Sequence, residues 1–175
     1  MPIEPLFPKQ TTPSRELLHD WAPRYAYQGD TEVEAIGRRA GTRGYFTNDE
    51  YRTVCYWKSP RSQSLVAKNA TGEIEEVTRL ALAVESERLR IGALTVLSGV
   101  AWPTASVILH LAHREPYPVL DVRALEALGI PQPSDYNFQF WWSYVVRCRS
   151  VAQGAGVSMR TLDRALWQYS KERGA

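Results

Sequence analysis

The chain has 175 residues, 44% of them hydrophobic and 23% charged, which fits one compact domain, or at most two small helical lobes, and excludes a disordered or fibrous protein. Two cysteines, Cys55 and Cys148, are too few for a four-cysteine zinc or iron–sulfur site or for a disulfide framework, and the three histidines form no HExxH pair. The net charge is only +2, but all except four of the 21 basic residues are arginine. This bias suits phosphate binding, and the base composition of a genome can also produce it.

The predicted elements are helical almost from the start of the chain. Residues 1–13 contain four prolines and predict an extended lead-in, without the basic and apolar regions of a secretory signal, so we expect a cytoplasmic protein. Capping residues, apolar spacing and Pro or Gly breaks then predict a series of helices. The first four cover 14–21, a segment capped by Asp30 or Thr31 that runs to the glycines at 41 and 44, 47–58 and 62–69. A longer helix follows Gly72, with an apolar stripe of Ile74, Val77, Leu80, Ala81 and Val84. The remaining helices cover 87–97, 103–113, 121–129 and 136–151, and a last helix begins at Ser158.

No window shows two-residue alternation over several strands, and no repeat of 20 to 50 residues is present. The fold class is therefore predicted to be all-α, with residues 14–175 forming a single helical domain. The 22 residues from 91 to 112 carry no charged side chain, which is long enough to cross a bilayer. Ser98, Gly99 and Pro103 interrupt this run, so we expect a buried helical hairpin at about 87–113 and no membrane span.

The turn of this hairpin reads Leu97-Ser98-Gly99-Val100-Ala101, and Trp102-Pro103-Thr104-Ala105 enters the next helix. A glycine in such a turn lets backbone amides point outwards at a helix start, where the N–H groups and the helix dipole favour an anion. An ordinary helical hairpin with a glycine turn and a proline in the first helical turn explains the same residues. Both interpretations stay open on these residues alone.

Asp121 follows an apolar extended run, Tyr117-Pro118-Val119-Leu120, and stands 22 positions after Gly99. An aspartate at a helix start is usually an N-cap. The pairing of this hairpin with this aspartate resembles the helix-hairpin-helix (HhH-GPD) DNA glycosylase superfamily, whose signature is L-x-G-V-G-x-x-T-A followed by F/V-P-[IV]-[LVI]-D. The resemblance is specific over about 35 residues, roughly a fifth of the chain.

The resemblance implies two helical lobes with a cleft between them, a hairpin that grips the phosphate backbone, and a flipped nucleotide whose N-glycosidic bond is cleaved with support from the aspartate. It assigns catalysis to Asp121, with a carboxylate that stabilises the positive charge on the sugar. It places DNA contacts at the hairpin residues Gly99, Val100, Ala101 and Thr104. Trp102, which lies in the hairpin itself, and Arg123, which follows Asp121, are further candidates for DNA contact. The partner it implies is double-stranded DNA, bound by a monomer, and it allows a monovalent cation at the hairpin. Several relatives carry an iron–sulfur cluster held by four cysteines, and because this chain has only two we expect no such cluster here.

The chain departs from the family pattern in two hairpin positions. The second hairpin glycine is Ala101, whose methyl group restricts close approach of the backbone to a phosphate. Pro103 stands where lyase-competent relatives carry a lysine, and proline has no amine for a Schiff base. We therefore expect a DNA N-glycosylase without lyase activity, or a non-catalytic DNA-binding module. A helical protein–protein adaptor in which Asp121 is only a cap is a third alternative.

Further side chains are candidates for a pocket or for DNA contact. Trp57, Lys58 and Arg61 combine two cations and an aromatic ring around the end of a helix, although lysine followed by proline is also ordinary C-terminal punctuation. Phe138 and Trp142 lie on one face of the aromatic helix and are candidates for a base-stacking cleft, with core filling as the alternative. Arg123 is a candidate for contact with a phosphate or with the target base, and a surface arginine that points into solvent is the alternative.

Overall fold

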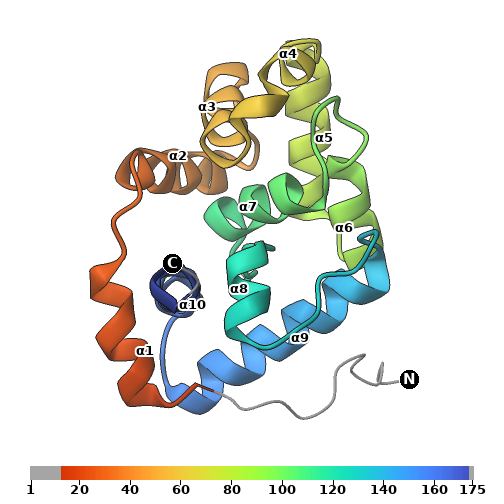
Figure 1. Ribbon diagram of the computed structural model, residues 1–175. Helices are drawn as coiled ribbons and strands as arrows, with labels where there is room; N and C mark the ends of the chain where they lie inside the picture. Colours follow the sequence, from red (N-terminus) through yellow and green to blue (C-terminus); the bar gives the residue numbers. More distant parts are fainter. Residues whose placement is uncertain (1–12, 174–175) are drawn as a thin grey trace. The chain divides into compact units, whose positions relative to one another are not determined.

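The computed structural model describes residues 13–173, so the predicted lead-in lies outside the described residues except for Pro13 (Figure 1). Helices and turns make up residues 13–173 and no β-strand occurs among them, which confirms the all-α fold class. The chain divides into two compact units. Unit 1 combines the residues up to Ala26 with those from Pro116 onwards, and unit 2 is the intervening segment Tyr27–Glu115.

Unit 2 is built around α7 (Trp102–Ala112), which contacts α2 (Asp30–Arg43), α3 (Asn48–Lys58), α5 (Thr71–Ala83) and α6 (Glu87–Leu94). A 3₁₀ turn (Pro60–Ser62) and the short α4 (Gln63–Val66) connect α3 to α5. The middle of α7 is fully buried from Ala105 to Leu109. Helix α2 approaches α7 so closely that a Cβ at Gly37 would lie 2.4 Å from the Leu111 carbonyl oxygen. These contacts explain why the uncharged run is buried within a cluster of helices. Within residues 13–173, no helix is long and apolar enough to span a membrane.

Unit 1 is organised by α10 (Met159–Arg173), which contacts α1 (Arg15–Trp21), the 3₁₀ turn η1 (Ala22–Arg24), α8 (Val122–Ala127) and α9 (Phe138–Ala155). Its core contains Trp141, Tyr144, Val145 and Cys148 of α9, all at most 1% exposed. Because these positions repeat at helical spacing, they form the inward face of α9.

Several predicted helix starts are confirmed by their capping bonds. Ser14 accepts the Leu17 N–H, Ser158 accepts the Thr161 N–H, and Thr47 forms a capping box with Glu50. The prediction that Asp30 or Thr31 caps α2 is wrong, because Asp30 is already helical and Gly29 is the N-cap. Gly29 has φ +81°, and a Cβ there would lie 3.2 Å from the Trp57 ring, so glycine fits the turn where a capping side chain would not.

Three further boundaries or faces differ from the prediction. Helix α6 ends at Leu94, three residues early, because the turns Thr95 N–H to Gly92 O and Leu97 N–H to Leu94 O tighten the chain before the hairpin. Helix α9 continues to Ala155, since its buried face extends through Val151 and Ala152. Leu80, predicted within the apolar stripe of α5, is 50% exposed; the buried face of that helix carries Ile74, Thr78 and Ala81 instead.

Candidate functional site

The hairpin in unit 2 consists of α6, the turn from 95 to 101, and α7. Ala101 is the N-cap of α7 and provides no side-chain cap, and Pro103 occupies the first helical turn. The Val100 N–H donates to the Leu97 carbonyl at 3.1 Å, which closes the turn. No side chain therefore caps the N-terminus of α7, and its N-cap residue, Ala101, is exposed. The positive end of the helix dipole favours an approaching anion at this place.

Gly99 is required by the geometry of this turn. Its φ is +79°, and a Cβ would lie 2.9 Å from both Cγ2 and the backbone nitrogen of Val66 and 3.0 Å from the Leu65 Cβ. The turn thus lies directly against α4. The sequence predicted a glycine that lets amides face outwards, whereas the structure shows that the Cα side of Gly99 faces α4 and that any side chain there would collide with it.

Asn69 holds the turn and was not recognised from the sequence. Its side chain is buried, with 6% exposed; Oδ1 accepts the Ser98 N–H at 2.8 Å, and Nδ2 donates to the Ser98 carbonyl at 2.9 Å and the Val66 carbonyl at 3.0 Å. Nδ2 also lies 3.0 Å from the Tyr51 hydroxyl. Both backbone groups of Ser98 are therefore fixed by one amide, a residue type whose donor and acceptor can bind both.

The other hairpin candidates differ in accessibility. Val100 and Thr104 are buried, at 6% and 3% exposed, so neither presents a side chain for the predicted DNA contact. Ala101 is exposed, and Trp102 is half-buried as the first residue of α7. The candidate contact surface of the hairpin is thus Ala101, Trp102 and the backbone beside them.

Trp57, near the end of α3, has a structural role. The Trp57 Nε1 donates to the Gln28 carbonyl at 3.0 Å, and its ring packs edge-on against Tyr27 with centroids 5.4 Å apart. Lys58 is the last residue of α3, and Arg61 is exposed one helical turn before Leu65, which contacts Gly99. Of these three candidates, Arg61 is the one that is exposed and also lies next to α4, the helix that supports the hairpin turn.

Asp121 lies in unit 1 as the half-buried N-cap of α8, where its Oδ1 accepts the Arg123 N–H at 2.9 Å. The residues before it, from Tyr117 to Leu120, lie outside any helix and are buried. The Tyr144 hydroxyl donates to the Val119 carbonyl at 2.8 Å, which anchors this run on α9. Burial raises the pKa of Tyr136, and the charge of Asp121 adds to that shift. Asp121 is consequently held in place by a buried segment, beside a phenol that stays protonated at neutral pH.

The remaining candidates in unit 1 are half-buried, and each of them packs against an aromatic ring. The guanidinium of Arg123 lies 5.4 Å from the centroid of the Trp167 ring, so this side chain covers an indole and does not extend freely from the helix. Phe138 and Trp142 are stacked with an interplanar angle of 5°, and Arg149 lies over Trp142 at 5.6 Å. The structure thus groups Asp121 and Arg123 in unit 1 and the hairpin candidates in unit 2, and the cleft between lobes stays a prediction.

Burial makes both cysteine thiols unreactive. The thiols of Cys55 and Cys148 are buried, and burial raises the pKa of each to about 12, so neither is a nucleophile at neutral pH. Among residues 13–173, no three His, Cys, Asp or Glu side chains gather to hold a metal ion.

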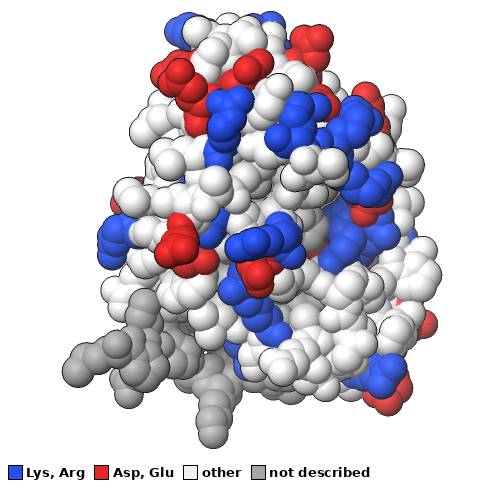
Figure 2. Space-filling view, turned by 180° about the vertical axis from the view of Figure 1, so that it is seen from behind, with Lys and Arg blue, Asp and Glu red and all other residues white. Residues whose placement is uncertain are grey.

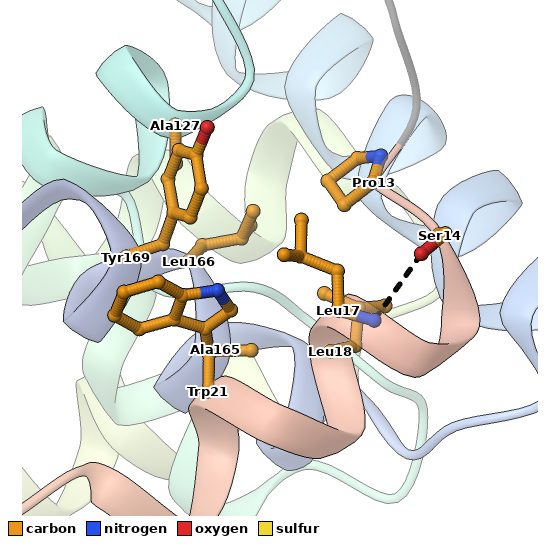
Figure 3. A pocket seen from close by; sticks show the side chains of 9 residues that line it. All are labelled: Pro13, Ser14, Leu17, Leu18, Trp21, Ala127, Ala165, Leu166 and Tyr169. Atoms are coloured by element: carbon orange, nitrogen blue, oxygen red, sulfur yellow. Dashed lines mark hydrogen bonds between the residues drawn. The ribbon is translucent and has the colours of Figure 1, made fainter. Parts of the chain in front are cut away.

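Unit 1 also contains a cavity of about 360 Å³ that the sequence did not predict (Figure 3). Leu17, Leu18 and Trp21 of α1 face Ala165, Leu166 and Tyr169 of α10 across it. The Trp21 and Tyr169 rings pack edge to face with centroids 5.3 Å apart. Ala127, at the far end of α8 from Asp121, also lines the cavity, so it is separate from the candidate carboxylate.

Comparison of the chain with protein-family models, with curated proteins and with solved structures finds no match.

Proposed function

We propose that this chain is a DNA-binding protein of the base-excision type, a DNA N-glycosylase without lyase activity, in which the hairpin of unit 2 holds the phosphate backbone and Asp121 stabilises the oxocarbenium ion. The observation that carries the proposal is the combination of two features. One is a helical hairpin with a left-handed Gly99 and no side-chain cap on α7. The other is a buried run outside any helix that ends in Asp121 at the start of α8.

The hairpin suits a phosphate because its turn is rigid. Asn69 fixes Ser98 through both backbone groups, and Gly99 lies against α4. A preorganised turn loses little conformational entropy when an anion binds. Contact through backbone amides carries no base sequence information, so the proposal predicts binding to duplexes of any sequence.

Asp121 suits the chemistry because a carboxylate stabilises positive charge that develops on the sugar as the N-glycosidic bond breaks. The capping bond to the Arg123 N–H occupies one of the roughly four acceptor positions of a carboxylate. Capping and charge stabilisation are therefore compatible in one side chain. Pro103 supplies no amine, so water is the acceptor of the sugar, and the product is an intact abasic strand.

A non-catalytic DNA-binding module is the second candidate. It is favoured by the capping role that Asp121 already fulfils and by Ala101 in place of the second hairpin glycine. In that case the hairpin binds duplex DNA and Asp121 only starts α8.

One substitution separates the two candidates. Asp121→Asn keeps an oxygen for the cap and changes helix stability by only some tenths of a kcal/mol, because Asn and Asp rank together as N-caps. It removes the negative charge, so base release is expected to fall by about 10²–10³-fold while duplex binding is retained. The matched control is Asp135→Asn, which removes the same charge from an exposed position in unit 1.

The assay measures base release from duplexes that carry uracil, 8-oxoguanine, alkylated bases or modified cytosines. Release by the parent and by Asp135→Asn, but not by Asp121→Asn, supports the glycosylase. Equal release by all three would reduce Asp121 to a cap. Duplex binding without release from any substrate favours the non-catalytic module, and absence of duplex binding favours the adaptor.

A further inference from the structure

A group of cations and aromatic rings lies along α10 and the segments that contact it in unit 1. We call it the α10 cluster; its members are Tyr25, Arg123, Arg160, Arg164, Trp167 and Lys171. Lys171 is exposed and the other five are half-buried. The elements that contribute them, η1 with the residue after it, α8 and α10, are in direct contact.

The rings and cations of the α10 cluster are arranged in pairs. Arg123 and Lys171 lie over Trp167 at 5.4 and 4.9 Å from the ring centroid. Arg160 and Arg164 lie over Tyr25 at 5.6 and 5.8 Å. The two rings meet edge to face with centroids 5.2 Å apart. Stacking on a ring restricts a long side chain before any ligand arrives, so less entropy is lost on binding.

Unit 1 contains ten basic and eight acidic side chains, and the α10 cluster gathers four of the basic ones. One of the four, Arg160, also pairs with Asp163 at 2.7 Å. By contrast, residues 27–115, which form unit 2, contain eleven basic and eleven acidic side chains and so have no net charge. On the face shown in Figure 2, basic side chains are interspersed with acidic ones. Affinity for a polyanion therefore has to come from a local cluster.

We infer that the α10 cluster is a second DNA-contact surface, which binds the phosphodiester backbone of the duplex on the unit that carries Asp121. The inference rests on the proposed function, and it gives unit 1 a positively charged contact surface in addition to the hairpin of the neutral unit 2. Arg123 connects the two features, because its backbone N–H donates to Asp121 and its guanidinium belongs to the α10 cluster. Phosphates bound there lie on the same unit as the carboxylate that acts on the sugar.

The stacking geometry favours phosphates over bases as the ligand. A guanidinium that covers a ring occupies the face on which a base would stack, while its N–H groups point sideways from the ring and match phosphate oxygens. Contacts of this kind are independent of base sequence and depend strongly on salt. An acidic protein segment would offer carboxylates to the same groups, and the experiment below includes it.

The test compares a double variant, Arg164→Gln with Lys171→Gln, with the parent. Both changes leave the Arg160 to Asp163 pair in place. The control double variant, Arg38→Gln with Arg114→Gln, removes two exposed charges from unit 2. Gly37 lies against Leu111, so both control positions are near the C-terminal end of α7, away from the hairpin turn. Circular dichroism verifies that each variant is folded.

Fluorescence anisotropy with an unmodified labelled duplex of about 20 base pairs gives the dissociation constant between 50 and 200 mM salt. Each phosphate contact contributes about 0.9 to the slope of log K against log salt, so loss of two lowers the slope by about 1.8. The parent should lose about 12-fold more affinity over this salt range than the α10 double variant does. The control should keep the parental slope.

Equal slopes for the parent and the α10 double variant, with binding by both, would overturn the α10 cluster as a DNA-contact surface and leave the proposed function intact. Absence of duplex binding by the parent would overturn both. Binding of a labelled poly-glutamate peptide more tightly than the duplex, with loss in the α10 double variant, would assign the α10 cluster to an acidic protein partner and overturn the inference.

Discussion

Substitution of Gly99 by alanine tests whether contact with α4 determines the hairpin turn. Two costs add. A residue with a Cβ at φ +79° costs about 1–2 kcal/mol in the left-handed region. The added Cβ also lies 2.9 Å from the Val66 nitrogen, a backbone atom that cannot rotate away, and overfilling of this kind costs about 1–3 kcal/mol. The expected loss is therefore about 2–5 kcal/mol, a large share of the 5–15 kcal/mol typical of a whole domain.

Gly44 provides the matched control in the same unit. Its φ is +90°, and no atom lies within 4 Å of a Cβ built there, so Gly44→Ala carries only the left-handed cost of about 1–2 kcal/mol. Urea unfolding followed by circular dichroism gives the total loss. Hydrogen exchange of the buried α7 amides assigns the loss to unit 2. If Gly99→Ala destabilises the protein no more than Gly44→Ala does, contact with α4 is not what requires glycine.

Two further predictions concern the surroundings of the hairpin. Asn69→Ala removes up to three hydrogen bonds at once, since two amide hydrogens and one carbonyl are lost, and should lower the free energy of unfolding in urea by about 3 kcal/mol. The control Lys68→Ala, at an exposed position, should change it by no more than about 0.5 kcal/mol. Equal losses in the two variants would contradict the role of Asn69 in holding the turn. Burial, and then the charge of Arg90, lower the pKa of His113, so the folded protein keeps this imidazole neutral and stability falls as the pH drops below the ordinary value near 6.5. His113→Gln should therefore show a shallower loss of unfolding free energy between pH 7 and pH 5, and an unchanged slope would refute this account.

Most helices were predictable because their signals are local. Ser14, Thr47 and Ser158 cap helices through bonds to residues three positions away, and the inward face of α9 follows from helical spacing alone. Local signals were insufficient where a distant residue occupies the available space. Gly29 starts α2 beside the Trp57 ring, and the turns before the hairpin shorten α6. No short sequence window contains that information.

The sequence by itself determined the all-α class, the hairpin at Gly99 and the place of Asp121 at a helix start, because dihedral preferences, capping and apolar periodicity act over a few residues. Only the tertiary structure decided what surrounds them. Asn69 reaches Ser98 across 29 positions, Gly99 meets Val66, and Arg123 covers Trp167, 44 residues further along the chain. Contacts over such separations depend on how several helices pack together, and they convert an ordinary turn and an ordinary surface arginine into a fixed loop and a stacked cation.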